Sequence, residues 1–194
     1  MLTADQIQQS IPRYLTSLQQ AELVRQLNDF ENRSYYTTLF PNDILQGDGW
    51  SSIEIVRFED GARDKIKGIL LSNSRDIDPA NRREFPSKII FAPLVRLNEY
   101  AKILESYFSS EQINNKLTAI RRQHITSLFF LPHGGSLETD YIAILDDLHT
   151  VPFDVFEKEP QRAKLFTLNQ MGFYLFVLKL SIHFCRFQDG DIRS

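Results

Sequence analysis

The side chains best suited to chemistry lie in a polar loop, residues 72–78, which follows an apolar stretch typical of a buried strand. Asn73 and Ser74 offer hydrogen bonds to a ligand. Arg75 presents a planar fork that suits phosphate or carboxylate, and Asp76 could hold that fork in place. The loop is therefore predicted to bind a ligand, and an Arg–Asp pair that only braces the loop is the alternative.

Basic residues surround this loop in the sequence. Residues 61–100 contain eight Lys or Arg and five Asp or Glu, a surplus of three positive charges. This surplus favours modest attraction to phosphate and is too small for a strong nucleic-acid binder. We predict that Arg82 and Arg83 take part in ligand binding, whereas a solvated surface of mixed charge is the alternative. The other members of this predicted basic face are Lys65, Lys67, Lys88 and Arg96.

His133 precedes a glycine pair, Gly134-Gly135, on a predicted turn. Because a glycine pair can expose backbone N–H groups to an anion, His133 is a further candidate for ligand binding. A plain hairpin turn is the alternative. No two of the four histidines stand three or four residues apart, so the sequence predicts no metal site, and we expect no cofactor.

The composition is that of an ordinary globular domain, with 42% apolar residues and a net charge of −3. It excludes disorder over most of the length, and the single cysteine, Cys185, excludes a disulfide scaffold. The first residues lack the basic start and apolar core of a secretory signal. Lys179 and His183 interrupt the longest apolar stretch, which is too short to span a bilayer. We therefore expect a cytoplasmic protein without membrane contact.

The spacing of apolar residues predicts a mixture of strands and helices. Strands are expected near residues 53–58, 66–71, 88–97, 125–131, 141–145, 150–156 and 165–167. Helices are expected over 97–108 and from two capping boxes, Ser109–Gln112 and Thr167–Gln170, onward. Another capping box at Thr3 and an apolar stripe from Ser17 predict helices before residue 33. The fold class is therefore expected to be α+β.

Three short motifs between residues 47 and 97 resemble the barrel of the MazF/PemK family of toxin ribonucleases. They are the turn Gly47-Asp48, the strand end Leu70-Leu71-Ser72-Asn73 and the apolar run Phe91-Ala92-Pro93-Leu94. The resemblance implies an SH3-like, mostly antiparallel β-barrel that often forms dimers. It also implies a toxin–antitoxin or phage-defence setting.

With the helices added, the resemblance predicts an SH3-like barrel carrying an inserted helical pair and N- and C-terminal helices. One domain over residues 1–194 is expected. Its predicted parts are a helical arm at 1–33, a barrel at 34–97 and 125–167, a helical insertion at 98–124 and a C-terminal helix at 168–187.

Cleavage of RNA without a metal needs a group that deprotonates the 2′-hydroxyl and a cation that holds the phosphate. The family has Thr or Ser where this chain has Val95, and an Arg-Pro step where this chain has Ile66-Lys67-Gly68. Val95 can play neither role. We therefore predict a binding or regulatory module without nuclease activity, with RNA or a protein as its partner.

Two alternative functions stay open at this stage. One is a metal-independent endoribonuclease of the MazF/PemK type, with Lys67, Arg75 and Asp76 as its catalytic residues. The other is a dimeric structural or interaction protein that forms a homodimer through its C-terminal helix.

Overall fold

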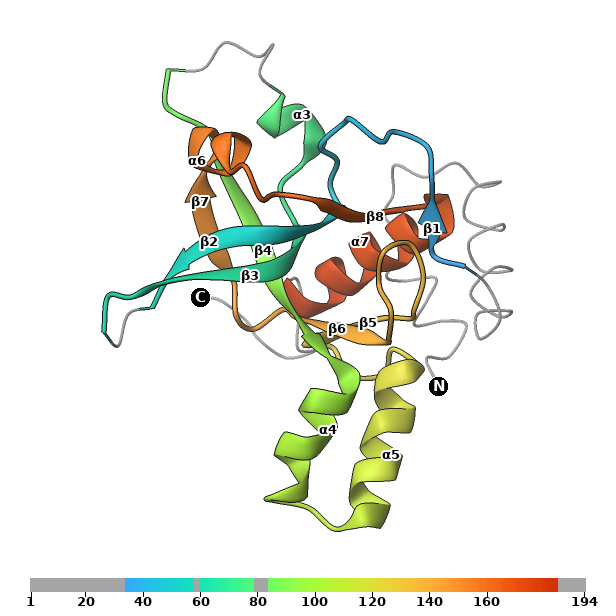
Figure 1. Ribbon diagram of the computed structural model, residues 1–194. Helices are drawn as coiled ribbons and strands as arrows, with labels where there is room; N and C mark the ends of the chain where they lie inside the picture. The colour runs from blue at the N-terminus through green and yellow to red at the C-terminus, as the bar shows by residue number, and fades with distance from the viewer. Residues whose placement is uncertain (1–33, 58–59, 79–83, 185–194) are drawn as a thin grey trace, which may run out of the picture.

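The computed structural model describes residues 34–57, 60–78 and 84–184, which form an α+β fold (Figure 1). The predicted helical arm at 1–33, together with Arg82, Arg83 and Cys185, lies outside the described residues. The strands are β1 (Tyr36–Thr37), β2 (Gly49–Val56), β3 (Arg63–Leu70), β4 (Lys88–Arg96), β5 (Leu128–Leu131), β6 (Tyr141–Ile144), β7 (His149–Pro152) and β8 (Lys164–Leu168). The helices in this part are α3 (Ser74–Ile77), α4 (Leu97–Glu105), α5 (Ser110–Arg121), α6 (Phe153–Lys158) and α7 (Gln170–Phe184).

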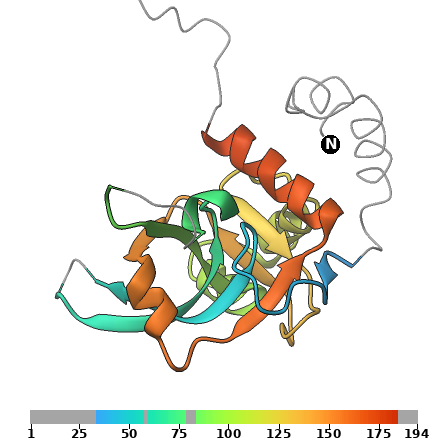
Figure 2. The ribbon, with the colours of Figure 1, turned by 90° about the horizontal axis from the view of Figure 1, so that it is seen from above.

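The strands form one curled antiparallel sheet, a half-barrel (Figures 1 and 2). Its order is β1-β8-β2-β3-β4-β6-β5, and β7 pairs with β4 beside that path. The predicted pairing of three successive strands, now β2, β3 and β4, is confirmed. The sequence also predicted closure into a barrel, whereas β1 and β5 end the order without a shared ladder in the described part of the chain.

The curl of the sheet depends on close contacts at the middle of β3. A Cβ atom on Gly68 would lie 2.7 Å from Cδ2 of Phe91, so glycine is needed where β3 crosses β4. Opposite this point, the register between β2 and β3 shifts between Trp50 and Ile53, and Ser52 adopts a φ of 56°. Such a bulge bends a strand and increases its twist.

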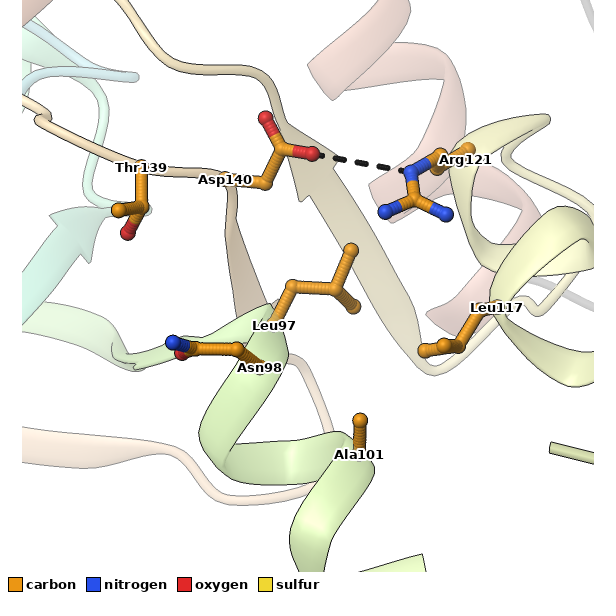
Figure 3. A pocket seen from close by; sticks show the side chains of 7 residues that line it. All are labelled: Leu97, Asn98, Ala101, Leu117, Arg121, Thr139 and Asp140. Atoms are coloured by element: carbon orange, nitrogen blue, oxygen red, sulfur yellow. Dashed lines mark ion pairs between the residues drawn. The ribbon is translucent and has the colours of Figure 1, made fainter. Parts of the chain in front are cut away.

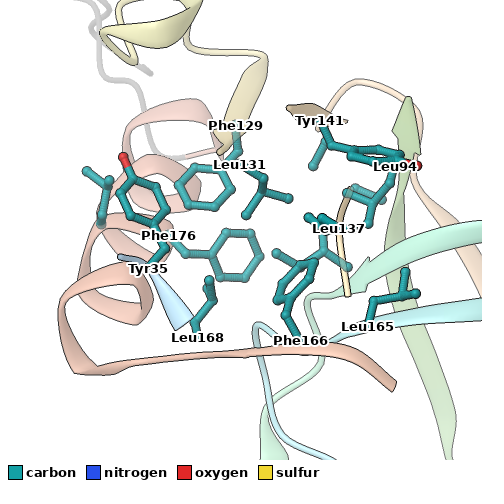
Figure 4. Close-up of a cluster of buried hydrophobic side chains, with 14 of the residues drawn as sticks. Tyr35, Leu94, Phe129, Leu131, Leu137, Tyr141, Leu165, Phe166, Leu168 and Phe176 are labelled. Atoms are coloured by element: carbon teal, nitrogen blue, oxygen red, sulfur yellow. The ribbon is translucent and has the colours of Figure 1, made fainter. Parts of the chain in front are cut away.

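Two apolar layers cover the two faces of the β4-β6-β5 part of the sheet. The concave face packs on α7 through a large cluster that includes Phe129, Phe166 and Phe176 (Figure 4). The opposite face packs under the α4–α5 hairpin, where Leu97 and Ile120 are buried. A third cluster, around Trp50 and Phe91, fills the end of the half-barrel near α6; its other buried members include Ile53, Ile89 and Phe156.

Helix starts were predicted with mixed success. Ser109 and Gln112 form the expected reciprocal capping box at the start of α5. The capping box expected at Thr167 is wrong, because Thr167 belongs to β8. Instead, Oδ1 of Asn169 accepts a hydrogen bond from the Gly172 N–H at 2.9 Å. An asparagine cap serves a helix start as well as a hydroxyl does, so the pattern alone did not separate the two positions.

Helix α7 packs on its own chain through Met171, Leu175, Phe176 and Leu178. The homodimer through this helix stays a prediction. No helix among the described residues is long and apolar enough to cross a membrane.

A buried ion pair joins the turn before β2 to β8. Asp48 is 0% exposed, and its Oδ2 lies 2.9 Å from Nζ of Lys164. Nζ also donates to the carbonyl oxygens of Phe40 and Asp43 and to Oγ1 of Thr167. Burial raises the pKa of Asp48, and the nearby Lys164 counteracts part of this effect. Removal of either partner would therefore leave the other buried without a compensating charge.

Lys164→Met should lower the free energy of unfolding by about 3 kcal/mol at pH 7, because Asp48 is left buried without its cation. Without Lys164, the pKa of Asp48 rises further above its value in the unfolded chain. The folded protein then holds this proton more tightly than the unfolded chain does, so the free energy of unfolding falls as pH rises. The loss should therefore be smaller at pH 5 than at pH 7, measured by urea unfolding. Lys158→Met removes an exposed pair with Asp154 and should change stability by less than about 1 kcal/mol. Equal losses in the two variants would contradict the role given to Asp48.

A second buried lysine connects α7 to the end of α5. Lys179 is 4% exposed, and its Nζ donates to the backbone oxygen of Gln123 at 2.6 Å. Burial lowers the pKa of Lys179 to about 8. The Gln123 side chain in turn bonds both backbone groups of Phe130, so α5, β5 and α7 meet at one buried polar point.

The free energy of unfolding should rise between about pH 8 and pH 10.5, because the unfolded chain keeps the Lys179 proton after the folded chain has lost it. This one group can contribute up to about 3 kcal/mol of that rise. Lys179→Met should remove this contribution, so that its free energy of unfolding rises less over the same pH range. Urea unfolding of the native chain and of the variant measures the difference. A slope that is the same in both proteins would show that Lys179 is not the group responsible.

Candidate functional site

The polar loop singled out in the sequence uses its side chains inside the protein. Oγ of Ser72 accepts from the Ile90 N–H at 2.7 Å, and Oγ of Ser74 accepts from the Gln46 N–H at 2.8 Å. Oδ1 of Asn73 caps α3 by accepting from the Arg75 N–H. Residues expected to form a plain loop thus contain a short helix. Asn73 caps this helix and Ser74 joins it to Gln46, so both side chains already have backbone partners, and the Arg–Asp bracing alternative stays open.

The three residues proposed for a nuclease lie on different elements. Arg75 and Asp76 are exposed on α3, which is at the top of Figure 1. Lys67 lies on β3, and its Nζ contacts Tyr141 of β6, which lies below β3 in the same view and just above the α4–α5 hairpin. The arrangement therefore directs attention to Lys67 and its surroundings rather than to α3.

Close packing requires glycine at both positions that follow His133 in the turn. A Cβ atom on Gly134 would lie 2.7 Å from the Tyr36 ring, and one on Gly135 would lie 2.9 Å from the Leu165 oxygen. Both glycines also have positive φ, and the Gly134 N–H donates to Leu137. These contacts favour the hairpin-turn alternative. The His133 side chain itself is 80% exposed, and its backbone N–H donates to Oδ1 of Asp140 at 3.1 Å.

The Tyr141 cluster, defined as Lys67, Arg96, Glu99 and Tyr141, lies where β4 ends and β6 begins. Nζ of Lys67 donates to the Tyr141 hydroxyl at 3.0 Å and lies 5.2 Å from the ring centroid. Arg96 is the register partner of Tyr141 across the β4–β6 ladder. Contacts with Glu99 and then with Tyr141 raise the pKa of Arg96. Lys67 and Arg96 thus both lie beside the Tyr141 phenol, and Glu99 already pairs with Arg96.

Lys67 differs from the other basic residues near it in its choice of partner. Lys65 pairs with Glu159 at 2.9 Å, Arg63 pairs with Glu54 at 3.0 Å, and Arg96 pairs with Glu99 at 2.8 Å. Within residues 34–57, 60–78 and 84–184, no carboxylate forms an ion pair with Lys67. Two members of the predicted basic face, Lys65 and Arg96, are thus paired with acids, whereas Lys67 and Lys88 have no carboxylate partner in the described part of the chain.

Tyr141 was missed by sequence reasoning. It is only 4% exposed and stands in an apolar stretch that predicts a strand, so nothing local marks it. Tyr141 joins the cluster because the register of β4 with β6 places it opposite Arg96 and because its hydroxyl accepts from Lys67 of β3. A pairing between strands far apart in the sequence leaves no motif behind.

Ser74→Ala should lower the free energy of unfolding by about 1 kcal/mol, because the Gln46 N–H loses its acceptor. It should not change binding of any ligand at the Tyr141 cluster. Urea unfolding measures the first effect, and the binding titration described below measures the second. A variant of full stability that binds ligand poorly would restore the 72–78 loop as the site.

Comparison with known proteins adds no relative to these observations. No protein-family model matches the chain, and no curated protein matches it. The likeness to the MazF/PemK family stays at the level of the motifs in residues 47–97. The function is therefore interpreted from the contacts at the Tyr141 cluster.

Proposed function

We propose that this chain is a binding module that holds a phosphate of single-stranded RNA at the Tyr141 cluster and does not cleave the strand. The observation that carries the proposal is the contact of Lys67, which has no carboxylate partner in the described part of the chain, with the hydroxyl of Tyr141, whose register partner is Arg96. An ammonium without a carboxylate partner is stabilised when an anion binds to it. An ammonium has three donors, and Lys67 spends one of them on Tyr141, so two are left for phosphate oxygens.

The absence of cleavage is proposed from the same geometry. Arg75 and Asp76 lie on α3, and Lys67 contacts β6. Val95 packs against the apolar cluster beneath the α4–α5 hairpin. The position at which the resembling family has a hydroxyl is thus occupied here by a partly buried apolar side chain. A general base and a phosphate-binding cation are both needed on one substrate, and this arrangement supports only the cation.

We also propose that the half-barrel is of the SH3-like type, as the MazF/PemK resemblance implies. The consecutive pairing of β2, β3 and β4 supports this proposal, since the resembling motifs lie on these strands and their connections. The regulatory role and the toxin–antitoxin or phage-defence setting follow from the resemblance alone. Cleavage-free binding of RNA would suit a member that regulates rather than degrades.

The proposal is tested with the full chain and a fluorescently labelled single-stranded RNA at low salt, in the presence of EDTA. We expect saturable binding by fluorescence anisotropy and intact RNA on a denaturing gel. Lys67→Gln should weaken binding by about three- to tenfold and reduce the slope of log K against log salt by about 0.7, because one phosphate contact is lost. Gln keeps the hydrogen bond to Tyr141 within reach, so the fold should be retained.

Lys88→Gln is the matched control, because Lys88 is exposed on the neighbouring strand β4 and lies outside the cluster. It should leave affinity nearly unchanged. If both variants lose RNA affinity equally, the effect comes from the overall charge of the protein, which would contradict a defined site. RNA cleavage that is abolished by Arg75→Ala would establish the nuclease alternative instead.

A further inference from the structure

A cavity of about 330 Å³ lies on the other side of β6 from the Tyr141 ring, between the first turn of α4, the last turn of α5 and the residues just before β6 (Figure 3). Asp140 lines this cavity, whereas the next residue, Tyr141, packs in the concave core. Successive residues of an extended chain point to opposite faces, so the two sites are separate. The lining residues are Leu97, Asn98, Ala101, Leu117, Arg121, Thr139 and Asp140.

A cation and an anion stand side by side at the head of the cavity. Nε of Arg121 lies 3.6 Å from Oδ2 of Asp140, longer than the 2.7–2.9 Å typical of charge-assisted hydrogen bonds. Arg121 is 52% exposed, and Figure 3 shows its terminal nitrogens turned toward the space above Leu97 and Leu117. The pair is thus loose, with the donors of Arg121 on one side and, on the other, a carboxylate whose Oδ1 also accepts from the His133 N–H.

The remaining walls divide into an apolar floor and a polar edge. Leu97, Ala101 and Leu117 form the floor, and Leu97 is the most deeply buried of the three. Asn98 and Thr139 stand at the edge, and both are exposed. A ligand that fits these walls has a charged head and a short apolar body.

We propose that this cavity binds a free apolar α-amino acid as a zwitterion. The ligand carboxylate would accept from the terminal nitrogens of Arg121, its ammonium would donate to Asp140, and its side chain would cover the apolar floor. A simple carboxylate would meet the charge of Asp140, and a simple amine would meet that of Arg121. Only a ligand that carries both charges on neighbouring atoms satisfies both residues.

The size of the cavity agrees with this choice. About 330 Å³ is at the lower end of the range for small-molecule sites, which suits a ligand of about ten non-hydrogen atoms. A ligand of that size in an open site should bind with a Kd of roughly 0.1–1 mM. The proposal does not depend on RNA binding, because none of the cavity residues belongs to the Tyr141 cluster.

Isothermal titration of the full chain with L-leucine and L-phenylalanine tests the proposal, and two analogues of leucine separate its parts. Leucinol lacks the carboxylate, and 4-methylvalerate lacks the ammonium. We expect saturable binding of at least one of the amino acids and affinities at least about tenfold weaker for both analogues. An analogue that binds as well as leucine, or no saturable binding of either amino acid up to about 10 mM, about ten times the weakest expected Kd, would overturn the proposal.

Arg121→Gln and Asp140→Asn should each weaken amino-acid binding by about tenfold or more, since each removes one charge from the head of the cavity. Lys102→Gln is the matched control, because Lys102 is exposed on α4 and does not line the cavity. Ala101→Leu fills the floor without touching the ion pair and should abolish binding. If Ala101→Leu unfolds with unchanged urea midpoint yet still binds leucine as the native chain does, the ligand lies elsewhere.

Discussion

The ion pair between Asp48 and Lys164 is the contact on which the half-barrel depends. A buried carboxylate is costly in free energy unless a cation and hydrogen-bond donors surround it. Those groups are present only when β8 lies beside the start of β2, because Lys164 is the first residue of β8 and Asp48 directly precedes β2. The same lysine binds the carbonyl oxygens of Phe40 and Asp43, which closes the preceding loop onto the sheet. One interaction thus sets the position of β8 relative to β2 and brings α7 over the core.

Three partly or fully buried lysines show how the choice of partner decides what an ammonium does. Lys164 has a carboxylate partner and serves the fold. Lys179 has only a backbone carbonyl, and burial therefore lowers its pKa to about 8. Lys67, on the interior strand β3, contacts the phenol of Tyr141, whose register partner is Arg96. Only the last arrangement leaves a positive charge that a ligand can reach, which is why Lys67 is the better candidate than the more numerous surface cations with carboxylate partners.

The elements that could be predicted from the sequence are those set by local patterns. Alternation of apolar residues predicted the strands that pair as β2, β3 and β4, and a capping box located the start of α5. The site residues could not be predicted in the same way. Asn73 and Ser74 have the polar groups of a binding loop, and only the structure shows that Arg75 N–H and Gln46 N–H already use them. Tyr141 required the register between β4 and β6, which depends on chain segments far apart.

The two proposed sites lie largely outside the segment that resembles the toxin family, so the resemblance alone does not predict their residues. Asp140 and Tyr141 are neighbours, yet one lines the cavity under the helical hairpin and the other lies in the concave core. Both stand outside residues 47–97, and so does Arg121. The segment whose motifs resemble the toxin family contains Lys67 and Arg96 but none of these three residues. The proposed anion site takes its tyrosine from β6, and the head of the cavity takes Arg121 from α5 and Asp140 from the residue before β6, all outside the segment that carries the resemblance. Function in this chain is best sought where residues outside that segment meet β3 and β4, since fold alone does not specify it.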